Sequence, residues 1–140
     1  MDLLLGEHAR ICSPGGWLEL LETDWEPRDG GEGAALWSEY LQQLCVARGC
    51  NPSAIFELVP SIEAAGFTDV RRLMVQLPLG SWGGAIGAQA RRIIFGAWEA
   101  LRGPMLESEI ITSEEFDRVL LMLDTELDER PMWLCLIVYL

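Results

Sequence analysis

The sequence is poor in histidine, in basic residues and in long apolar runs. It contains one histidine, His8, and four scattered cysteines without a Cys-x-x-Cys pair, so we expect reduced thiols and no metal site. Ten lysines and arginines stand against 22 acidic residues, and the net charge of -12 disfavours binding to nucleic acid or to an anionic membrane surface. No apolar run reaches the roughly 18 to 20 residues of a membrane span, and residues 1–8 lack the basic start of a secretory signal. These absences predict a cytoplasmic protein.

The rest of the composition predicts one folded domain. Half of the 140 residues are apolar and 23% are charged, which is enough to bury a core and excludes intrinsic disorder. A chain of this length forms one domain of ordinary size, so we expect a single domain over residues 1–140. The acidic surplus is most simply a solvated surface, because most of it lies at helix positions.

Apolar periodicity predicts an α/β fold with three strands. The strands are expected over 17–23, 67–77 and 132–140, and the last suits a central strand because it is apolar throughout. Helices are expected between them. Their ranges are 2–11, 36 to about Gly49, Asn51 to Gly66 with a kink or break at Pro60, 86–101, and a Thr112–Glu115 capping box to Pro131.

Three short segments follow one another in a recognisable order. Residues 9–20 read Ala-Arg-Ile-Cys-Ser-Pro-Gly-Gly-Trp-Leu-Glu-Leu, residues 64–70 read Ala-Ala-Gly-Phe-Thr-Asp-Val, and residues 78–82 read Pro-Leu-Gly-Ser-Trp, with Gly87 following. The first resembles the start of strand five of class I methyltransferases, and the others resemble the start of strand six and the segment after it. In this order they are similar to the fungal secondary-metabolism methyltransferase-like family, which includes the velvet-associated regulatory methyltransferases.

The resemblance concerns the C-terminal, substrate-facing half of that family's fold. It implies a truncated Rossmann-like sheet of about three strands with a helical substrate cap, completed by oligomerisation. The family binds S-adenosylmethionine in its other half, through a glycine-rich turn after strand one and an acidic residue after strand two. Gly80, Gly83, Gly84 and Gly87 follow a predicted strand, but their spacing does not match Gly-x-Gly-x-x-Gly. We therefore expect no cofactor and no methyl transfer by this chain alone.

Candidate catalytic residues lie near the first predicted strand. Glu22 and Asp24 stand at its end, where open α/β sheets bind ligands, so either carboxyl could donate a hydrogen bond or remove a proton. His8 is a candidate acid or base because it is the only imidazole. The alternative is that both carboxylates are solvated or cap nearby backbone, and that His8 has no chemical role.

Six of the 140 residues are tryptophan, and the resemblance implies that five of them lie around a substrate cavity, which would suit a hydrophobic small-molecule substrate. The candidate substrate-binding residues are Trp25, Trp37, Tyr40, Trp82, Ile86, Trp98 and Trp133. Aromatic residues at helical spacing are also typical of a core. This alternative applies least to Trp25 and Trp82, because proline and glycine flank them.

These features lead to functions of different classes. The first is a cofactor-independent enzyme of fungal secondary metabolism that holds a polyketide or terpenoid intermediate for cyclisation or isomerisation, as a pericyclase or Diels-Alderase does. The second is a non-catalytic regulatory or binding subunit of a larger methyltransferase. A third is a fragment of an ordinary S-adenosylmethionine-dependent methyltransferase. In each case an uncovered strand edge predicts a homodimer or a complex with another chain.

Overall fold

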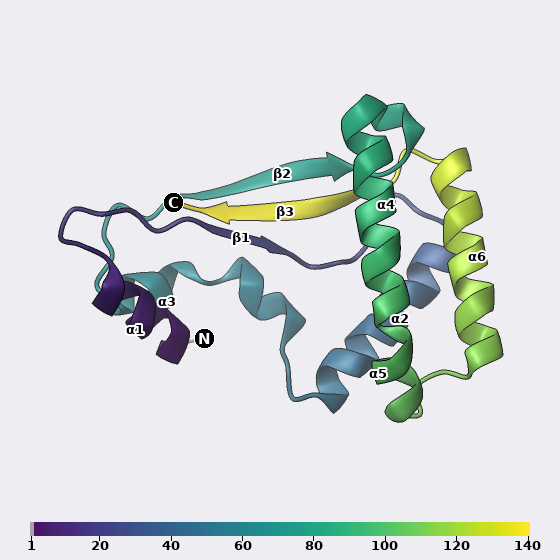
Figure 1. Cartoon of the computed structure of the whole chain (residues 1–140), viewed down its shortest axis with the longest axis horizontal. Coiled ribbons are helices and arrows are strands. Elements are labelled where there is room, and N and C mark those ends of the chain that lie inside the picture. Colours follow the sequence, from purple (N-terminus) through teal and green to yellow (C-terminus); the bar gives the residue numbers. More distant parts are fainter. Residues whose placement is uncertain (1) are drawn as a thin grey trace. The chain divides into compact units, whose positions relative to one another are not determined.

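The computed structural model describes residues 2–140 and confirms the predicted α/β class with three strands (Figure 1). In chain order the elements are α1 (Asp2–Ile11), β1 (Leu20–Thr23), α2 (Glu32–Ala47), the 3-10 helix η1 (Pro52–Phe56), α3 (Val59–Ala64), β2 (Arg72–Pro78), the 3-10 helix η2 (Ser81–Gly83), α4 (Gly84–Ala100), α5 (Arg102–Glu107), α6 (Ser113–Glu129) and β3 (Trp133–Tyr139). Within the described residues, no helix combines the length and the apolar character needed to cross a membrane.

The last strand of the chain lies in the middle of the sheet, whose order is β1-β3-β2. β1 pairs antiparallel with β3, with Leu20 opposite Tyr139. Arg71 and Leu140 exchange two backbone hydrogen bonds of 2.8 and 2.9 Å, so β2 also runs antiparallel to β3 (Figure 1). The apolar sequence of β3 accounts for its central place, because every side chain of this strand is buried or half-buried.

The two outer strands are shorter than the sequence predicts. β1 begins at Leu20 instead of residue 17, and Trp17 is 86% exposed outside the sheet. β2 begins at Arg72 instead of residue 67. Gly66 and Asp69 precede it with φ angles of +102° and +60°, and such left-handed backbone is incompatible with a strand.

The helical segment predicted after Asn51 is divided, but not at Pro60. η1 ends at Phe56, and α3 begins at Val59. Pro60 lies in the first turn of α3, where the missing N–H of a proline leaves no helical hydrogen bond unmade. The break therefore falls before the proline, in residues 57–58.

Contacts within the chain divide it into two compact units. Unit 1 comprises Met1–Asp24, Ser53–Val75 and Leu136–Leu140, and unit 2 comprises Trp25–Pro52 and Gln76–Cys135. Helices α1 and α3 belong to unit 1, whereas α2, α4, α5 and α6 belong to unit 2. β2 and β3 contribute residues to both units.

Unit 2 has an apolar core between its helices. α2 packs on α6, and α5 contacts α2, α4 and α6. Trp37 of α2, Trp98 of α4 and Phe116 of α6 are the largest side chains of this core, and each is at most 1% exposed. The other buried members are Ala34, Leu44, Leu79, Ala90, Ile94, Met105, Ile111, Val119, Leu120, Leu123, Leu127, Met132 and Leu134.

Unit 1 has a smaller buried cluster. α1 contacts α3, and Leu5, Leu58 and Ile62 are buried. Tyr139 of β3 holds the segment before α3: its hydroxyl donates a 2.6 Å hydrogen bond to the carbonyl of Ile55 and accepts a 3.4 Å bond from the N–H of Leu58. Because β3 is the central strand, these bonds fasten the helical segment to the sheet.

Candidate functional site

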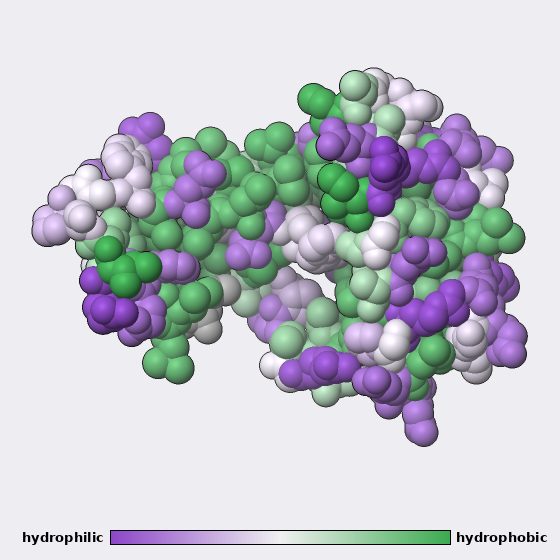
Figure 2. All heavy atoms as spheres, in the orientation of Figure 1, coloured by the Kyte–Doolittle hydropathy of each residue, from purple (hydrophilic) through white to green (hydrophobic). Residues whose placement is uncertain are grey.

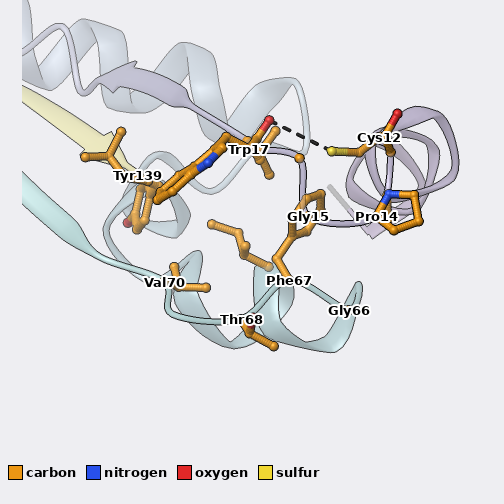
Figure 3. A pocket seen from close by; sticks show the side chains of 15 residues that line it. Cys12, Pro14, Gly15, Trp17, Gly66, Phe67, Thr68, Val70 and Tyr139 are labelled. Atoms are coloured by element: carbon orange, nitrogen blue, oxygen red, sulfur yellow. Dashed lines mark hydrogen bonds between the residues drawn. The ribbon is translucent and has the colours of Figure 1, made fainter.

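A pocket of about 350 Å³ lies in unit 1 beside the turn that precedes β1 (Figure 3). It is lined mainly by residues 12–18, by residues 66–68 with Val70, and by the end of β3. In Figure 3, Cys12 lies on one side of the pocket and Tyr139 on the opposite side. The wall is thus assembled from segments that are far apart in the sequence.

Two of the segments that carry the methyltransferase resemblance meet at this pocket. The Ser-Pro-Gly-Gly-Trp turn supplies one part of the wall, and the Gly-Phe-Thr segment before β2 supplies another. The sequence predicts Trp17, Phe67 and Thr68 as strand residues, but they lie in the segments before β1 and β2. A pocket could not be predicted from the sequence, because only the fold brings these segments together. Their joint appearance as family motifs is the one signal that could have indicated it.

The lining suits apolar contact better than acid–base chemistry. No Asp, Glu or His side chain of the described residues lines the pocket. The Cys12 thiol lies 3.9 Å from the carbonyl oxygen of Trp17, as a weak hydrogen bond, and Ser13 and Thr68 add hydroxyl groups. The volume is at the small end of the ~300 to 1,000 Å³ typical of small-molecule sites. A small aliphatic or aromatic group fits such a space.

The three candidate catalytic residues lie outside the lining of this pocket. His8 is in α1, and its Nδ1 is buried without a hydrogen-bond partner in the described part of the chain. Glu22 lies in β1 opposite Ile137, and Asp24, which is 5% exposed, follows that strand. No three His, Cys, Asp or Glu side chains are grouped to hold a metal within the described residues. The catalytic role of these three residues stays a prediction.

Two of the candidate substrate-binding tryptophans lie in the core of unit 2. The rings of Trp37 and Trp98 are 5.3 Å apart at an interplanar angle of 47°, and Phe116 meets Trp37 edge-on at 6.1 Å. Both indole N–H groups are buried without a hydrogen-bond partner among residues 2–140. This is the packing that the core interpretation predicts. A substrate could reach either ring only if the core opened.

Trp82 and Ile86 lie around the turn after β2. The indole N–H of Trp82 donates to the carbonyls of Leu79 and Met132 at 2.8 and 3.1 Å. These bonds fasten the turn to the segment before β3 and leave the ring about half exposed. Ile86, the first residue of the helix predicted over 86–101, is 67% exposed on α4 and is not among the buried residues of that helix.

Trp25 lies in the loop that follows β1, and Trp133, the first residue of β3, is bonded to the same loop. The indole N–H of Trp133 donates a 2.7 Å hydrogen bond to the carboxylate of Asp29, and Trp133 also pairs with Arg28 through the backbone. Trp25 and Asp29 have φ angles of +59° and +60°. For a side chain as bulky as tryptophan, this conformation costs about 1 kcal/mol or more. The loop is therefore held in a strained shape by its neighbours.

Tyr40 forms a small polar group at the margin of the unit 2 core. Its hydroxyl donates to Glu115 at 3.3 Å, and Arg118 donates to the same carboxylate at 2.6 Å. Burial raises the pKa of Tyr40, and the charge of Glu115 raises it further. The hydrogen bond from Arg118 lowers the pKa of Glu115. Tyr40 is therefore a hydrogen-bond donor at neutral pH and not a base.

A glycine-rich turn at residues 30–33 opens α2, and a carboxylate of the chain itself fills it. Glu126 of α6 is 9% exposed and accepts hydrogen bonds from the backbone N–H groups of Gly31, Gly33 and Ala34 at 2.9, 2.7 and 3.1 Å. A Cβ at Gly31 would lie 2.6 Å from this carboxylate. Sequence reasoning missed Glu126, because its partners lie at the other end of the chain.

A second glycine-rich turn, before α4, is closed by backbone. The N–H of Gly80 donates to the carbonyl of Gly87 at 3.1 Å. A Cβ at Gly87 would lie 2.3 Å from the Gly80 carbonyl oxygen, and a Cβ at Gly83 would lie 2.4 Å from Cβ of Pro78. These glycines therefore permit the chain to pack closely on itself.

Neither turn fits S-adenosylmethionine, the cofactor that the resemblance implies. Nucleotide cofactors bind where the backbone N–H groups at a helix N-terminus are open to the ligand. In the described residues, the N–H groups at the start of α2 are bound to Glu126, and the turn before α4 is filled by its own backbone. These two turns offer the cofactor no cradle.

Comparisons with known proteins identify relatives over about half of the chain. The chain is 38% identical over 76 residues to the secondary metabolism regulator laeA of Aspergillus flavus, a match that covers 49% of this chain and 20% of the regulator. The laeA regulators of Aspergillus niger and Aspergillus fumigatus are 38% and 37% identical over 80 and 85 residues, which cover 52% and 54% of this chain. No family model and no solved structure matches the chain.

The resemblance to the fungal methyltransferase-like family is thereby confirmed as a partial relationship. Over about half its length the chain is related to fungal secondary-metabolism regulators of the methyltransferase family. The chain spans about a fifth of the length of the curated relatives it matches.

Proposed function

We propose that the chain is a methyltransferase-like regulatory module that acts in fungal secondary metabolism by binding another polypeptide. The observation that carries this proposal is the 37 to 38% identity to four regulators of secondary metabolism. The proposal includes a Rossmann-like sheet completed by another chain, and no methyl transfer by this chain alone.

Two features of unit 2 support binding over catalysis in this chain. The glycine-rich turn at the start of α2 is bound to Glu126, and the turn before α4 is closed by its own backbone, so neither presents N–H groups to a cofactor. Trp37 and Trp98 stabilise the core, where they are at most 1% exposed. Both features favour a structural role for residues that would otherwise suggest a reaction site.

Cofactor-independent cyclisation has less support. It requires an aromatic cavity that holds a folded substrate. The pocket in unit 1 contains Trp17 and Phe67, but none of the seven predicted substrate-binding residues lines it. It also lacks Asp, Glu and His side chains among the described residues that line it. The cyclase therefore stays a hypothesis that the experiment below would detect.

Gene deletion with metabolite and transcript profiling tests the proposed function. A regulator is expected to change several unrelated product families together, with matching changes in the transcripts of their biosynthetic genes. A cyclase is expected to change one pathway, with accumulation of its linear precursor and unchanged transcripts. The second result would overturn the proposal. Complementation with the intact gene is the control for secondary effects of the deletion.

Calorimetric titration of the purified chain with S-adenosylmethionine tests the remaining alternative. We expect no saturable heat of binding, because the two glycine-rich turns are filled. Light scattering on the same sample gives the mass in solution. Saturable binding by the chain alone would support the interpretation as part of an ordinary methyltransferase and would overturn the non-catalytic proposal.

A further inference from the structure

In unit 1 the strands present a row of apolar side chains to one side of the sheet. Leu21 of β1 lies opposite Val138 of β3. Arg71 and Leu140 exchange backbone hydrogen bonds and therefore lie opposite each other in an antiparallel pair. Two residues further along this pair, Leu73 of β2 also lies opposite Val138. Side chains directly opposite each other point to the same face, so Leu21, Val138 and Leu73 form one row across the sheet.

A second row lies two residues along on the same face and contains Thr23, Leu136 and Val75. The apolar members on the two outer strands are 48 to 61% exposed, and those on β3 are half-buried. We call the apolar surface of these two rows the open sheet face. Its members are Leu21, Leu73, Val75, Leu136 and Val138.

Along the central strand β3, the opposite face of the sheet is covered by the chain. Ile137 and Tyr139 alternate with the open-face residues along β3, and both are at most 1% exposed. The hydroxyl of Tyr139 is bonded to the segment before α3. In the orientation of Figure 1, apolar residues gather over the strands at the molecular surface (Figure 2). Helical structure thus covers β3 on one face in unit 1, and the second face remains apolar and accessible.

The open sheet face has the dimensions of one helix. Three strands spaced by about 4.8 Å, with two rows about 7 Å apart, make a patch of roughly 10 by 15 Å once side chains are included. Three turns of an α-helix are about 16 Å long and about 10 Å wide. A stable dimer buries ~800 Å² on each partner, which is several times the area of this patch. The patch alone is therefore too small to hold two copies of the chain together.

Charge also disfavours a second copy as the occupant. Each chain has a net charge of -12, so two copies repel one another. Unit 1 contains three arginines and eight acidic residues, and so has a net charge of -5. A partner with basic residues beside its apolar contact is attracted to this surface, and an acidic partner is repelled.

We propose that the open sheet face is the docking site for one amphipathic helix of a partner protein, with an apolar stripe at i, i+3, i+4 and i+7 and with lysine or arginine beside it. Packing of an amphipathic helix is the ordinary way to bury an apolar sheet face. Helices that bind in the grooves of other proteins use the same spacing of apolar residues. The inference rests on the proposed function only in that the chain acts by binding a polypeptide.

Fluorescence anisotropy with the full chain tests the docking site. The probe is a labelled helical peptide of about 18 residues with leucines at that spacing and lysines on both flanks. Leu73→Lys is expected to weaken its binding at least about tenfold, because a charge replaces a leucine that the helix buries. Val75→Thr keeps the branched shape and should weaken it about threefold.

The matched control is Met74→Lys. Met74 is the neighbour of Leu73 in β2, is 59% exposed against 50%, and points to the opposite face. We expect peptide affinity within about twofold of the unmodified chain, which is below ordinary single-contact effects. Equal weakening by Leu73→Lys and Met74→Lys would overturn the proposal, as would no binding of the lysine peptide or equal binding of a peptide with glutamate in place of lysine. Urea unfolding of each variant confirms that it is folded.

Light scattering tests whether a second copy of the chain occupies the open sheet face instead. A dimer of the chain that Leu73→Lys converts to a monomer would overturn the partner-helix proposal in favour of self-association. The outcome is independent of the gene deletion. If the folded chain binds the peptide through this face but deletion of its gene leaves the metabolite profiles unchanged, the docking site is supported and the proposed function is wrong. If the deletion changes the profiles but the peptide does not bind, only the docking site is wrong.

Discussion

The carboxylate of Glu126 accepts a 2.7 Å hydrogen bond from the backbone N–H of Gly33, 93 positions earlier in the chain. The other carboxylate oxygen accepts from Gly31 and Ala34. The first turn of a helix has N–H groups without partners in the helix, and a negative charge there is favourable. A side chain of α6 therefore caps α2 from outside, in addition to the apolar contacts between the two helices.

Replacing Glu126 by alanine should lower the free energy of unfolding by about 2 to 4 kcal/mol, because three backbone N–H groups lose a charged acceptor where little water is present. Glu126→Gln keeps one acceptor oxygen and should lose about half as much. Urea unfolding followed by tryptophan fluorescence measures both losses. Glu129 is exposed near the end of the same helix, so Glu129→Ala should change stability by less than about 0.5 kcal/mol. Equal losses in the two alanine variants would contradict the capping role.

Gly87 and Gly96 of α4 should respond to alanine in opposite directions. A Cβ at Gly87 would lie 2.3 Å from the carbonyl oxygen of Gly80, so Gly87→Ala should lower the free energy of unfolding by about 2 kcal/mol or more. No atom lies within 4 Å of a Cβ at Gly96, so Gly96→Ala should raise it by about 0.5 to 1 kcal/mol through helix propensity. Thermal unfolding of both variants is the measurement. If Gly87→Ala is as stable as Gly96→Ala, the turn before α4 is not closed as described.

Trp98→Ala separates the core interpretation from the substrate-binding one. Trp98 is 0% exposed, so the substitution should lower the free energy of unfolding by about 3 to 5 kcal/mol. Trp17 is 86% exposed and provides the control, because Trp17→Ala should change stability by less than about 0.5 kcal/mol. Urea unfolding followed by circular dichroism compares the two. Unchanged stability of Trp98→Ala would restore the cavity interpretation for this residue.

Local patterns in the sequence were sufficient for most helices and for the central strand. The Thr112 half of the predicted capping box is confirmed by a 3.2 Å hydrogen bond from the N–H of Glu115 to the Thr112 hydroxyl, a contact between residues three positions apart, whereas the Glu115 carboxylate accepts from Tyr40 and Arg118. The apolar periodicity of residues 86–101 predicts the helix α4 but not which of its apolar residues are buried, because Ile86 and Ile93 are 67% and 61% exposed. Spacing shows which residues share a side of a helix, but it does not show how far the neighbouring elements extend over that side.

The contacts that define the candidate site could not be predicted in this way, because they join distant segments. Periodicity places Trp37 and Trp98 on apolar sides of two helices, but only the packing of those helices shows that the rings meet at 5.3 Å. The same holds for Trp17 and Tyr139, which line one pocket from opposite ends of the chain. For Glu126 the sequence gives no signal at all, since a carboxylate near the end of a helix is ordinarily solvated.

Two ion pairs, one between α4 and α6 and one within α6, predict a loss of stability in acid. The hydrogen bond from Arg91 of α4, and then its charge, hold the pKa of Asp128 of α6 below the ordinary value of 3.8. The hydrogen bond from Arg118 likewise lowers the pKa of Glu115 from 4.5. A carboxyl group whose pKa is lower in the folded state stabilises the fold above its unfolded pKa. This stabilisation is lost as the pH falls through the folded pKa, so the free energy of unfolding should decrease below about pH 4.5.

Arg91→Gln should remove the part of this acid dependence that belongs to Asp128. The difference in free energy of unfolding between the unmodified chain and this variant should be constant from about pH 7 to 5 and should shrink below about pH 4, where Asp128 becomes protonated in both. Urea unfolding at a series of pH values measures it. Arg92 is exposed beside Arg91, so Arg92→Gln should follow the unmodified chain in parallel at every pH. A difference for Arg91→Gln that stays the same at pH values near 3 would show that Asp128 is not held ionised by this arginine.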